Sequence, residues 1–148
     1  MNWLTHHTAP VRLHSGQRSH WLIDAQAIFE NEHLRRLVLD CWFPFVQNWP
    51  NPYIVGIRRG GVPWARALAE RIGAPWSDDT SVPKRSWHGF DSILVVDDVL
   101  TTGASLREVQ ADAAFVVVDR SHGEAVPYAV SWMTLWLPTL EDEEEDVS

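Results

Sequence analysis

The sequence predicts a single-domain α/β fold built around a mostly parallel sheet flanked by helices. Compact apolar runs of strand length, at residues 53–57, 93–96 and 115–118, alternate with segments whose apolar residues have helical spacing. Strands that alternate with helices form βαβ units, in which successive strands run parallel. With 148 residues, 45% of them hydrophobic, the chain can bury one substantial core.

The first half of the chain predicts a strand, a helix, a loop and a second strand. Residues 19–24 have the pattern of a short strand or extended segment. Residues 25–41 carry apolar side chains at helical spacing, and Pro44 is expected to close this helix because proline cannot continue the hydrogen-bond ladder. The proline-containing segment 48–52 predicts a stiff loop before the strand at 53–57.

The second half predicts further strand–turn–helix units. A glycine-rich turn leads into a helix that ends at Gly73, where a C-terminal cap is expected. The polar residues 75–91 predict a loop, and the uninterrupted apolar run 93–96 predicts a strand buried on both faces. Residues 101–105 have turn chemistry, and a helix is expected at 106–114. The last two strands are expected at 115–118 and 132–137.

The charge distribution separates a body, residues 1–140, from an acidic tail, residues 141–148. The chain has 12 basic and 20 acidic side chains, and six of the acids form an unbroken run in the tail. We expect this tail to be solvated and disordered. The body has no dense Lys/Arg cluster, which argues against nucleic-acid binding, and no apolar stretch of the roughly 18 to 20 residues that span a membrane.

Other features of the composition indicate a reducing compartment. The single cysteine, Cys41, excludes an internal disulfide framework and a cluster of cysteine metal ligands. Residues 1–10 lack the basic start and apolar run of a secretory signal. We therefore expect a cytoplasmic protein.

The most informative segment reads ILVVDDVLTTGAS, residues 93–105. A buried parallel strand is expected to end at Asp97 and Asp98, which places both carboxylates at the edge where open α/β sheets bind ligands. The turn at 101–105 offers hydroxyls and the free amides of a helix start, which suit a phosphate. Carboxylates accept hydrogen bonds from vicinal hydroxyls, so the segment fits a ribose 5-phosphate. The alternative is that it only ends a strand and caps a helix.

A second segment, YIVGIRRGGVPWA, suits a diphosphate. Here a strand runs into a glycine-rich turn with two arginines and then into a helix. Glycine amides and guanidinium groups together bind anionic oxygens well. The alternative is a turn whose arginines only face solvent.

Two other known motifs fit the segments 93–105 and 53–65 less well. The run ILVVDD also resembles the opening strand of response-regulator receiver domains, but these need a longer chain after the acid pair than the 50 residues that follow Asp98. A phosphate-binding loop of the form G-x-x-x-x-G-K-[ST] is absent.

The segment VVDDVLTTGAS resembles the motif with which type I phosphoribosyltransferases bind 5-phosphoribosyl-1-pyrophosphate (PRPP). The resemblance implies that Asp97 and Asp98 hold the ribose 2- and 3-hydroxyls, and that the turn binds the 5-phosphate. The turn at Arg58, Arg59, Gly60 and Gly61 is similar to the pyrophosphate loop of the same family. The implied ribose and 5-phosphate residues are Asp97, Asp98, Val99, Leu100, Thr101, Thr102, Gly103, Ala104 and Ser105.

Two further segments resemble the orotate phosphoribosyltransferases within this family. LHSGQRS followed by WLID resembles the N-terminal segment that forms part of a hood over the base, expected here mainly at residues 10–24. It implies base contacts from Ser15, Gly16 and Arg18. FVVVDR resembles a late strand of the same enzymes, in which the arginine, here Arg120, is implied to contact orotate.

The resemblance implies a type I phosphoribosyltransferase fold, a homodimer, and Mg²⁺ that is held mainly through PRPP, near Asp97 and Asp98. The implied reaction transfers 5-phosphoribose from PRPP to a nucleobase, with orotate the best single choice, and releases pyrophosphate. The implied catalytic residues are Asp97, Asp98, Lys84, Arg85 and His88.

The chain also departs from the family pattern. The loop before the acid pair, at residues 82–91, is shorter than in orotate enzymes, and His14 stands where the hood usually has a lysine. A non-catalytic PRPP-binding sensor, or a transferase for another base, therefore remain alternatives.

Overall fold

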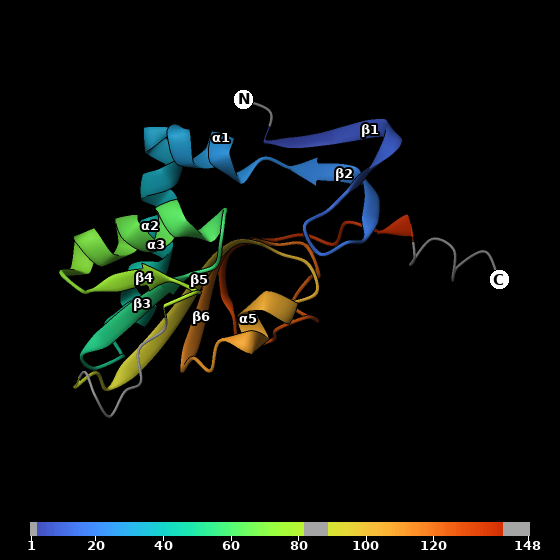
Figure 1. The fold of residues 1–148 in the computed structure, drawn as a ribbon. Helices are drawn as coiled ribbons and strands as arrows, with labels where there is room; N and C mark the ends of the chain where they lie inside the picture. The colour runs from blue at the N-terminus through green and yellow to red at the C-terminus, as the bar shows by residue number, and fades with distance from the viewer. Residues whose placement is uncertain (1–2, 82–88, 141–148) are drawn as a thin grey trace.

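The computed structural model describes residues 3–81 and 89–140. Five parallel strands form the central sheet, in the order β4-β3-β5-β6-β7, and a separate antiparallel pair, β1-β2, lies above it in Figure 1. The strands are β1 (Leu4–Arg12), β2 (Arg18–Ile23), β3 (Pro52–Gly56), β4 (Trp76–Asp78), β5 (Ser92–Leu100), β6 (Ala113–Asp119) and β7 (Val130–Thr134). The helices are α1 (Ala25–Glu30), α2 (Glu32–Val46), α3 (Gly61–Ile72) and α5 (Ala104–Glu108). The α/β class is confirmed.

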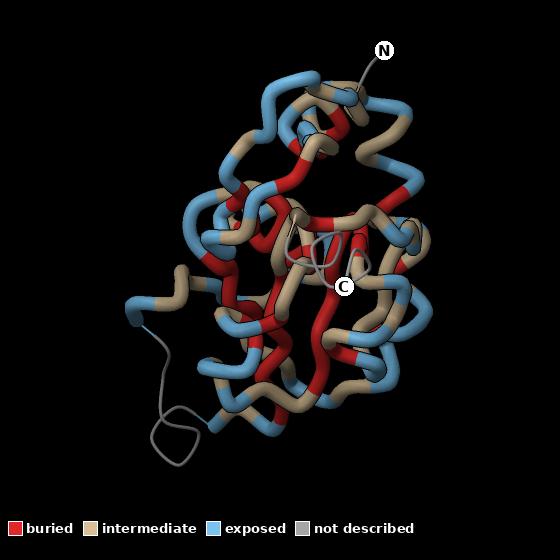
Figure 2. Tube along the Cα trace, turned by 90° about the vertical axis from the view of Figure 1, so that its right-hand side faces the viewer, coloured by how far each residue is buried: buried red, intermediate tan, exposed pale blue. Residues whose placement is uncertain are grey.

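Helices cover both faces of the sheet. On one face, Leu94 and Val96 of β5 pack in a cluster with Trp42 of α2 and Trp64 of α3. On the other face, Val95 packs with Leu106 of α5. Successive residues of a strand point to opposite faces, so a strand covered on both sides must be apolar throughout. This explains the uninterrupted apolar run before the acid pair, and Figure 2 shows the buried residues gathered in these central strands.

The N-terminal helix differs from the prediction in two ways. It is divided at Asn31, whose extended backbone ends α1 and whose side chain accepts a hydrogen bond from Leu34 N at 3.0 Å. An asparagine that caps the following helix in this way stabilises a new helix start. Pro44 lies inside the last turn of α2, so the prediction that it closes the helix is wrong. Burial of Val46 against the core holds this turn in place.

Other boundaries also differ. The predicted loop at 75–91 contains β4, which pairs with β3. The helix expected at 106–114 begins at Ala104 and ends at Glu108, because Val109 is extended and the chain then enters β6. The last strand begins at Val130, before the expected residue 132, and ends at Thr134.

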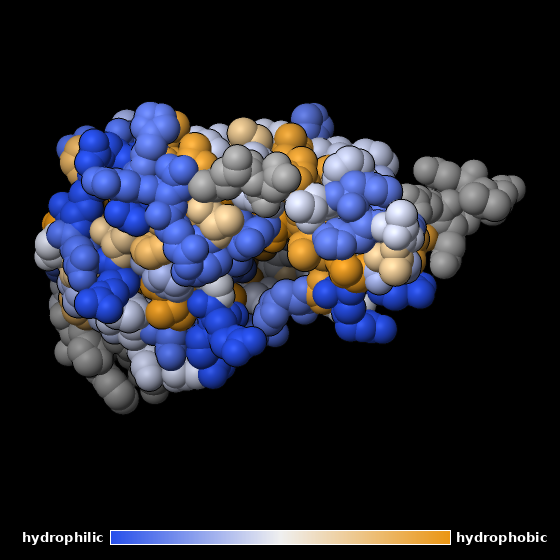
Figure 3. All heavy atoms as spheres, turned by 90° about the horizontal axis from the view of Figure 1, so that it is seen from above, coloured by the Kyte–Doolittle hydropathy of each residue, from blue (hydrophilic) through white to orange (hydrophobic). Residues whose placement is uncertain are grey.

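The N-terminal segment forms a small antiparallel sheet. β1 pairs with β2 from Leu4↔Ile23 to Arg12↔Arg18, with an irregularity between His6 and Val11. We call this pair, with its connecting turn, the hood. The acidic tail, residues 141–148, lies outside the described residues. No helix in the described part of the chain is both long and apolar enough to cross a membrane. Seen from above (Figure 3), apolar residues are scattered in small groups among hydrophilic ones.

Candidate active site

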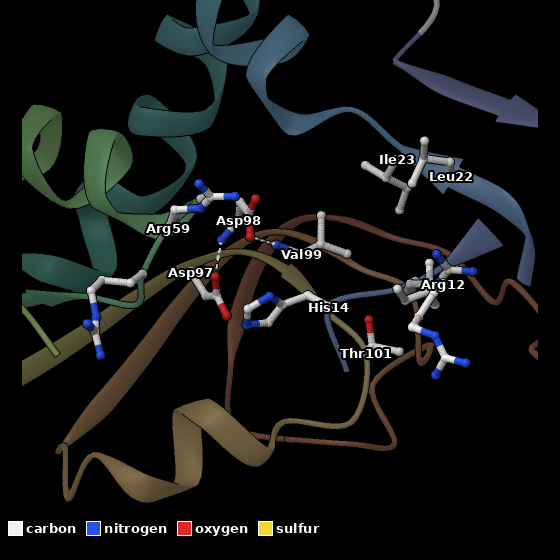
Figure 4. A pocket seen from close by; sticks show the side chains of 13 residues that line it. Arg12, His14, Leu22, Ile23, Arg59, Asp97, Asp98, Val99 and Thr101 are labelled. Atoms are coloured by element: carbon white, nitrogen blue, oxygen red, sulfur yellow. Dashed lines mark hydrogen bonds between the residues drawn. The ribbon is translucent and has the colours of Figure 1, made fainter. Parts of the chain in front are cut away.

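The two carboxylates lie within the carboxyl half of β5. The strand continues beyond them to Leu100, because β6 pairs with it as far as Leu100↔Asp119, so the prediction that the strand ends at the acids is wrong. Each carboxylate accepts a hydrogen bond from the next main-chain amide, Asp97 from Asp98 N at 2.8 Å and Asp98 from Val99 N at 2.7 Å (Figure 4). The main chain thereby orients both carboxyl groups.

Asp97 is the most strongly perturbed titratable group described. Burial, followed by the neighbouring charge of Asp98, raises its pKa to about 9. Asp97 therefore carries a proton at pH 7 in the ligand-free protein. A perturbed carboxyl in a cavity wall is typical of a functional site, because its environment is built for a positive or hydrogen-bonding ligand.

The glycine-rich turn packs directly on the acid pair. A Cβ atom at Gly60 would overlap the Asp98 carboxyl group, and one at Gly61 would lie 2.5 Å from the Val96 carbonyl oxygen. Glycine at both positions lets the turn approach the strand this closely, and at Gly61 the clash would be with backbone that cannot move aside. The peptide bond between Arg58 and Arg59 in this turn is cis.

The two arginines of the turn have different surroundings. Arg58 donates to Asp79 Oδ1 from its main-chain N at 3.1 Å and from Nε at 2.9 Å. Arg59 is exposed and lies beside Asp98 in Figure 4. Both side chains line the cavity over the acid pair. Two guanidinium groups at one wall of a cavity suit an anionic ligand with several oxygens.

The turn after β5 forms a second cavity, of about 170 Å³. Gly103, at φ 78°, takes the left-handed conformation that glycine adopts without strain and precedes α5. Thr102 Oγ1 accepts a hydrogen bond from Ala104 N at 3.3 Å. The lining residues are His14, Ser15, Asp97, Val99, Leu100, Thr101, Thr102, Gly103, Ala104, Ser105 and Leu106. The whole predicted phosphate turn therefore faces one small cavity, together with the hood turn.

The cavity over the acids has a volume of about 290 Å³ and adjoins the second one. Asp97, Val99, Thr101 and His14 line both. In Figure 4 the His14 ring projects into the space between Asp97 and Thr101. The lining residues of the larger cavity are Arg12, Leu13, His14, Leu22, Ile23, Arg58, Arg59, Gly60, Asp97, Asp98, Val99, Thr101 and Arg120.

The hood supplies cavity residues that the sequence analysis missed. Arg12, Leu13, Leu22 and Ile23 line the cavity over the acids. Leu13 opens the motif LHSGQRS, Leu22 and Ile23 belong to WLID, and Arg12 directly precedes the first motif, so the motifs themselves are the signal that could have found them. Leu22 and Ile23 add an apolar wall, which suits the face of a planar base.

Some of the predicted base-binding residues line a cavity and others do not. Arg120 lines the larger cavity and Ser15 the smaller one. Gly16, whose φ of 92° suits the hood turn, and the exposed Arg18 line neither cavity, so their base contacts stay predictions. Gly61 is buried beneath the turn. The predicted catalytic residues Lys84, Arg85 and His88 lie outside the described residues.

Comparisons with known proteins identify relatives. No model of a protein family matches the chain. Over 132 residues it is 30% identical to orotate phosphoribosyltransferase of Aeropyrum pernix, a match that covers 75% of this chain and 70% of that protein. It is also 30% identical to orotate phosphoribosyltransferase of Pyrobaculum aerophilum, with 80% and 70% covered. The chain belongs to the orotate phosphoribosyltransferase family.

Solved structures agree with this family and its fold. The crystal structure of the Aeropyrum pernix orotate phosphoribosyltransferase superposes with a TM-score of 0.70 at 26% identity, covering 98% of this chain and 93% of that one. Adenine phosphoribosyltransferase from Giardia lamblia, complexed with 9-deazaadenine, gives a TM-score of 0.58 at 15% identity, which shows a shared fold alone. The type I phosphoribosyltransferase fold is thereby confirmed.

Proposed function

We propose that this member of the orotate phosphoribosyltransferase family transfers the 5-phosphoribosyl group of PRPP to orotate and releases pyrophosphate. The observation that carries the proposal is the pair of adjoining cavities. Asp97 and Asp98 stand between a turn that suits a 5-phosphate and two arginines that suit a diphosphate. PRPP has the same order of groups, with ribose hydroxyls between two anionic ends.

In this proposal the protein acts by positioning and by charge. The hydroxyls of ribose bond to the Asp97 and Asp98 carboxyl groups, and the 5-phosphate accepts hydrogen bonds from the turn at 101–105. A ring nitrogen of the base forms a bond to C1 of ribose as the bond from C1 to pyrophosphate breaks, and the proton of that nitrogen passes to solvent. Arg58 and Arg59 stabilise the charge of the leaving pyrophosphate, and positive charge that develops at C1 favours the ionised form of Asp97.

The residues present also fit Mg²⁺, which the proposal includes. Magnesium usually takes one or two protein carboxylates and completes its shell with water and substrate phosphates. Asp97 and Asp98 line the cavity, whereas no group of three or more His, Cys, Asp and Glu side chains in the described ranges could hold a metal ion. Most of the ligands would therefore come from PRPP. When bound, the ion neutralises diphosphate charge.

The proposal further includes a homodimer that acts in the cytoplasm. Light scattering coupled to size exclusion would give about twice the chain mass of 16.9 kDa. The predicted loop residues Lys84, Arg85 and His88 are retained in the proposal as catalytic candidates. A PRPP sensor is not favoured, because the curated relatives reported above carry the name of a transferase.

The deciding experiment measures pyrophosphate release from PRPP and Mg²⁺ with orotate, uracil, hypoxanthine, guanine, xanthine and adenine offered separately. The double variant Asp97→Asn/Asp98→Asn is the blank. Release with orotate alone, absent in the blank, supports the proposal, and release with another base alone names a different acceptor. If no base gives pyrophosphate release while PRPP still binds in a calorimetric titration, the result would favour the sensor.

A further inference from the structure

Ser19 is a fully buried hydroxyl at the junction of the hood, the sheet and the C-terminal segment. Its Oγ atom donates to the Pro138 carbonyl at 2.8 Å and accepts from Trp21 N at 3.1 Å and from Arg120 Nη2 at 3.0 Å. A serine hydroxyl has one donor and two acceptor positions, and all three are used here. Such a hydroxyl cannot rotate without breaking a bond, so it fixes the groups around it.

Arg120, which follows β6, is the group that this hydroxyl constrains at the cavity. Its side chain is buried, with 3% exposed, and burial lowers its pKa. Nη1 donates to the Trp21 carbonyl at 3.1 Å and Nη2 donates to Ser19, so two hood groups hold the plane of the guanidinium. Nε is buried and has no hydrogen-bond partner among the described residues.

An unpaired N–H on a buried guanidinium is costly, so the two hood bonds through Nη1 and Nη2 are what hold Arg120 in its orientation. Arg120 lines the cavity over the acid pair, as do Leu22 and Ile23, and its Nη1 bonds the carbonyl of Trp21, the residue before Leu22. A planar base with a carboxylate or carbonyl oxygen would contact this wall with its face and the arginine with its edge. Recognition then depends on the angle at which the guanidinium is held.

We propose that Ser19 is a positioning residue for base recognition and acts through Arg120. This inference rests on the proposed transferase function and deepens it. The hydroxyl sets the orientation of the arginine and ties it to the hood, so that the base meets a donor already in place. Removing the hydroxyl leaves the guanidinium with only its Nη1 bond to the Trp21 carbonyl, and it takes one partner from Trp21 N and one from the Pro138 carbonyl.

Ser92 provides a matched control. It is also a buried serine, 1% exposed, whose hydroxyl donates to a proline carbonyl, that of Pro50, at 2.7 Å. It lies at the start of β5, far along the strand from the acid pair, and lines none of the cavities described above. Ser19→Ala and Ser92→Ala therefore remove the same kind of bond, and only the first removes a partner of Arg120.

The kinetic test compares KM for the base at saturating PRPP with KM for PRPP at saturating base. We expect Ser19→Ala to raise the base KM about tenfold and to leave the PRPP KM within about twofold, and Ser92→Ala to leave both within about twofold. In an Arg120→Lys background, Ser19→Ala should add less than about twofold to the base KM. An unchanged base KM, an equal rise in both KM values, or a full additional effect in the Arg120→Lys background would overturn the inference.

A second measurement does not need activity. The Nε–H proton of Arg120 gives an NMR signal, which is identified by its loss in Arg120→Lys. We expect Ser19→Ala to shift or broaden this signal and Ser92→Ala to leave it unchanged, whereas no change in Ser19→Ala would contradict the positioning role. If the wild-type protein releases no pyrophosphate with any base, the proposed function fails and the NMR result still decides whether Ser19 orients Arg120.

Discussion

Asp79 holds Arg58 through a single oxygen atom. Its Oδ1 accepts a hydrogen bond from the main-chain N of Arg58 at 3.1 Å and another from the guanidinium Nε at 2.9 Å. Asp79 belongs to the segment that the sequence predicts only as a polar loop, whereas Arg58 belongs to the predicted pyrophosphate turn. The contact therefore links the segment after β4 to the wall of the cavity, where Arg58 and Arg59 meet the acid pair.

Asp79→Ala should weaken PRPP binding modestly. The pair is partly exposed, with 53% of the Arg58 side chain and 23% of the Asp79 side chain accessible, so its loss is expected to cost at most about 1 kcal/mol. This corresponds to a rise in the PRPP KM of about two- to fivefold. Asp40→Ala, which breaks the remote Arg71–Asp40 pair, is the control. The same rise in both variants would remove the assigned role of Asp79.

Asp97 makes stability depend on pH. Its folded-state pKa of about 9 lies above the ordinary value of 3.8. Between these values the folded chain keeps a proton that the unfolded chain has lost, so the free energy of unfolding falls as pH rises through this window. Below pH 3.8 the contribution of Asp97 to the free energy of unfolding is fully present, and above about pH 9 it is lost.

Asp97→Asn should therefore gain stability relative to the wild type as pH rises. Urea unfolding followed by circular dichroism at pH 5, 6, 7 and 8 would measure the free energy of unfolding of both proteins. The value for the variant minus that for the wild type should increase by up to about 1.4 kcal/mol per pH unit. Titrating groups remote from Asp97 are common to both proteins and cancel, so the difference reports the interacting pair of Asp97 and Asp98. Parallel curves over this range would show that Asp97 titrates normally.

Substitutions of the two glycines in the predicted pyrophosphate turn should have different effects. In Gly60→Ala the new methyl meets the Asp98 carboxyl group, a side chain that can move, so we expect a loss of about tenfold or more in kcat/KM with little change in stability. In Gly61→Ala it meets backbone, the Val96 carbonyl oxygen at 2.5 Å and Asp97 Cα at 2.9 Å. We expect this variant to lose roughly 1–3 kcal/mol of stability. Urea unfolding and pyrophosphate release separate the two, and equal stability losses would contradict the assignment.

Removal of divalent metal should abolish turnover without unfolding the protein. The proposed ion is held mainly by PRPP, so chelation with EDTA should stop pyrophosphate release and leave the thermal midpoint of the ligand-free protein unchanged. Added Mg²⁺ should restore the rate. A lowered midpoint in EDTA would indicate a structural metal, and full activity in EDTA would remove Mg²⁺ from the proposal.

Several secondary-structure elements could not be read from the sequence. β1 lies in a hood with many exposed residues, so it lacks the continuous apolar run that marks the central strands. β4 has only three residues and is defined by its pairing with β3. The break at Asn31 did have a local signal, because asparagine followed by Glu32 is a favourable helix start. Pro44 shows the opposite case, in which packing overrides a local preference.

The parallel strands and the order of the acid pair, the predicted phosphate turn and the predicted pyrophosphate turn could be read from the residues alone. These features are local, because burial on both faces demands continuous apolar runs and each turn carries its own glycines and polar groups. Three contacts, by contrast, depend on how distant segments pack: His14 lines both cavities, Asp79 holds Arg58, and Ser19 holds Arg120. Ser19 and Arg120 lie 101 residues apart in the chain, so their contact follows from how the hood packs on the sheet, which no local pattern records.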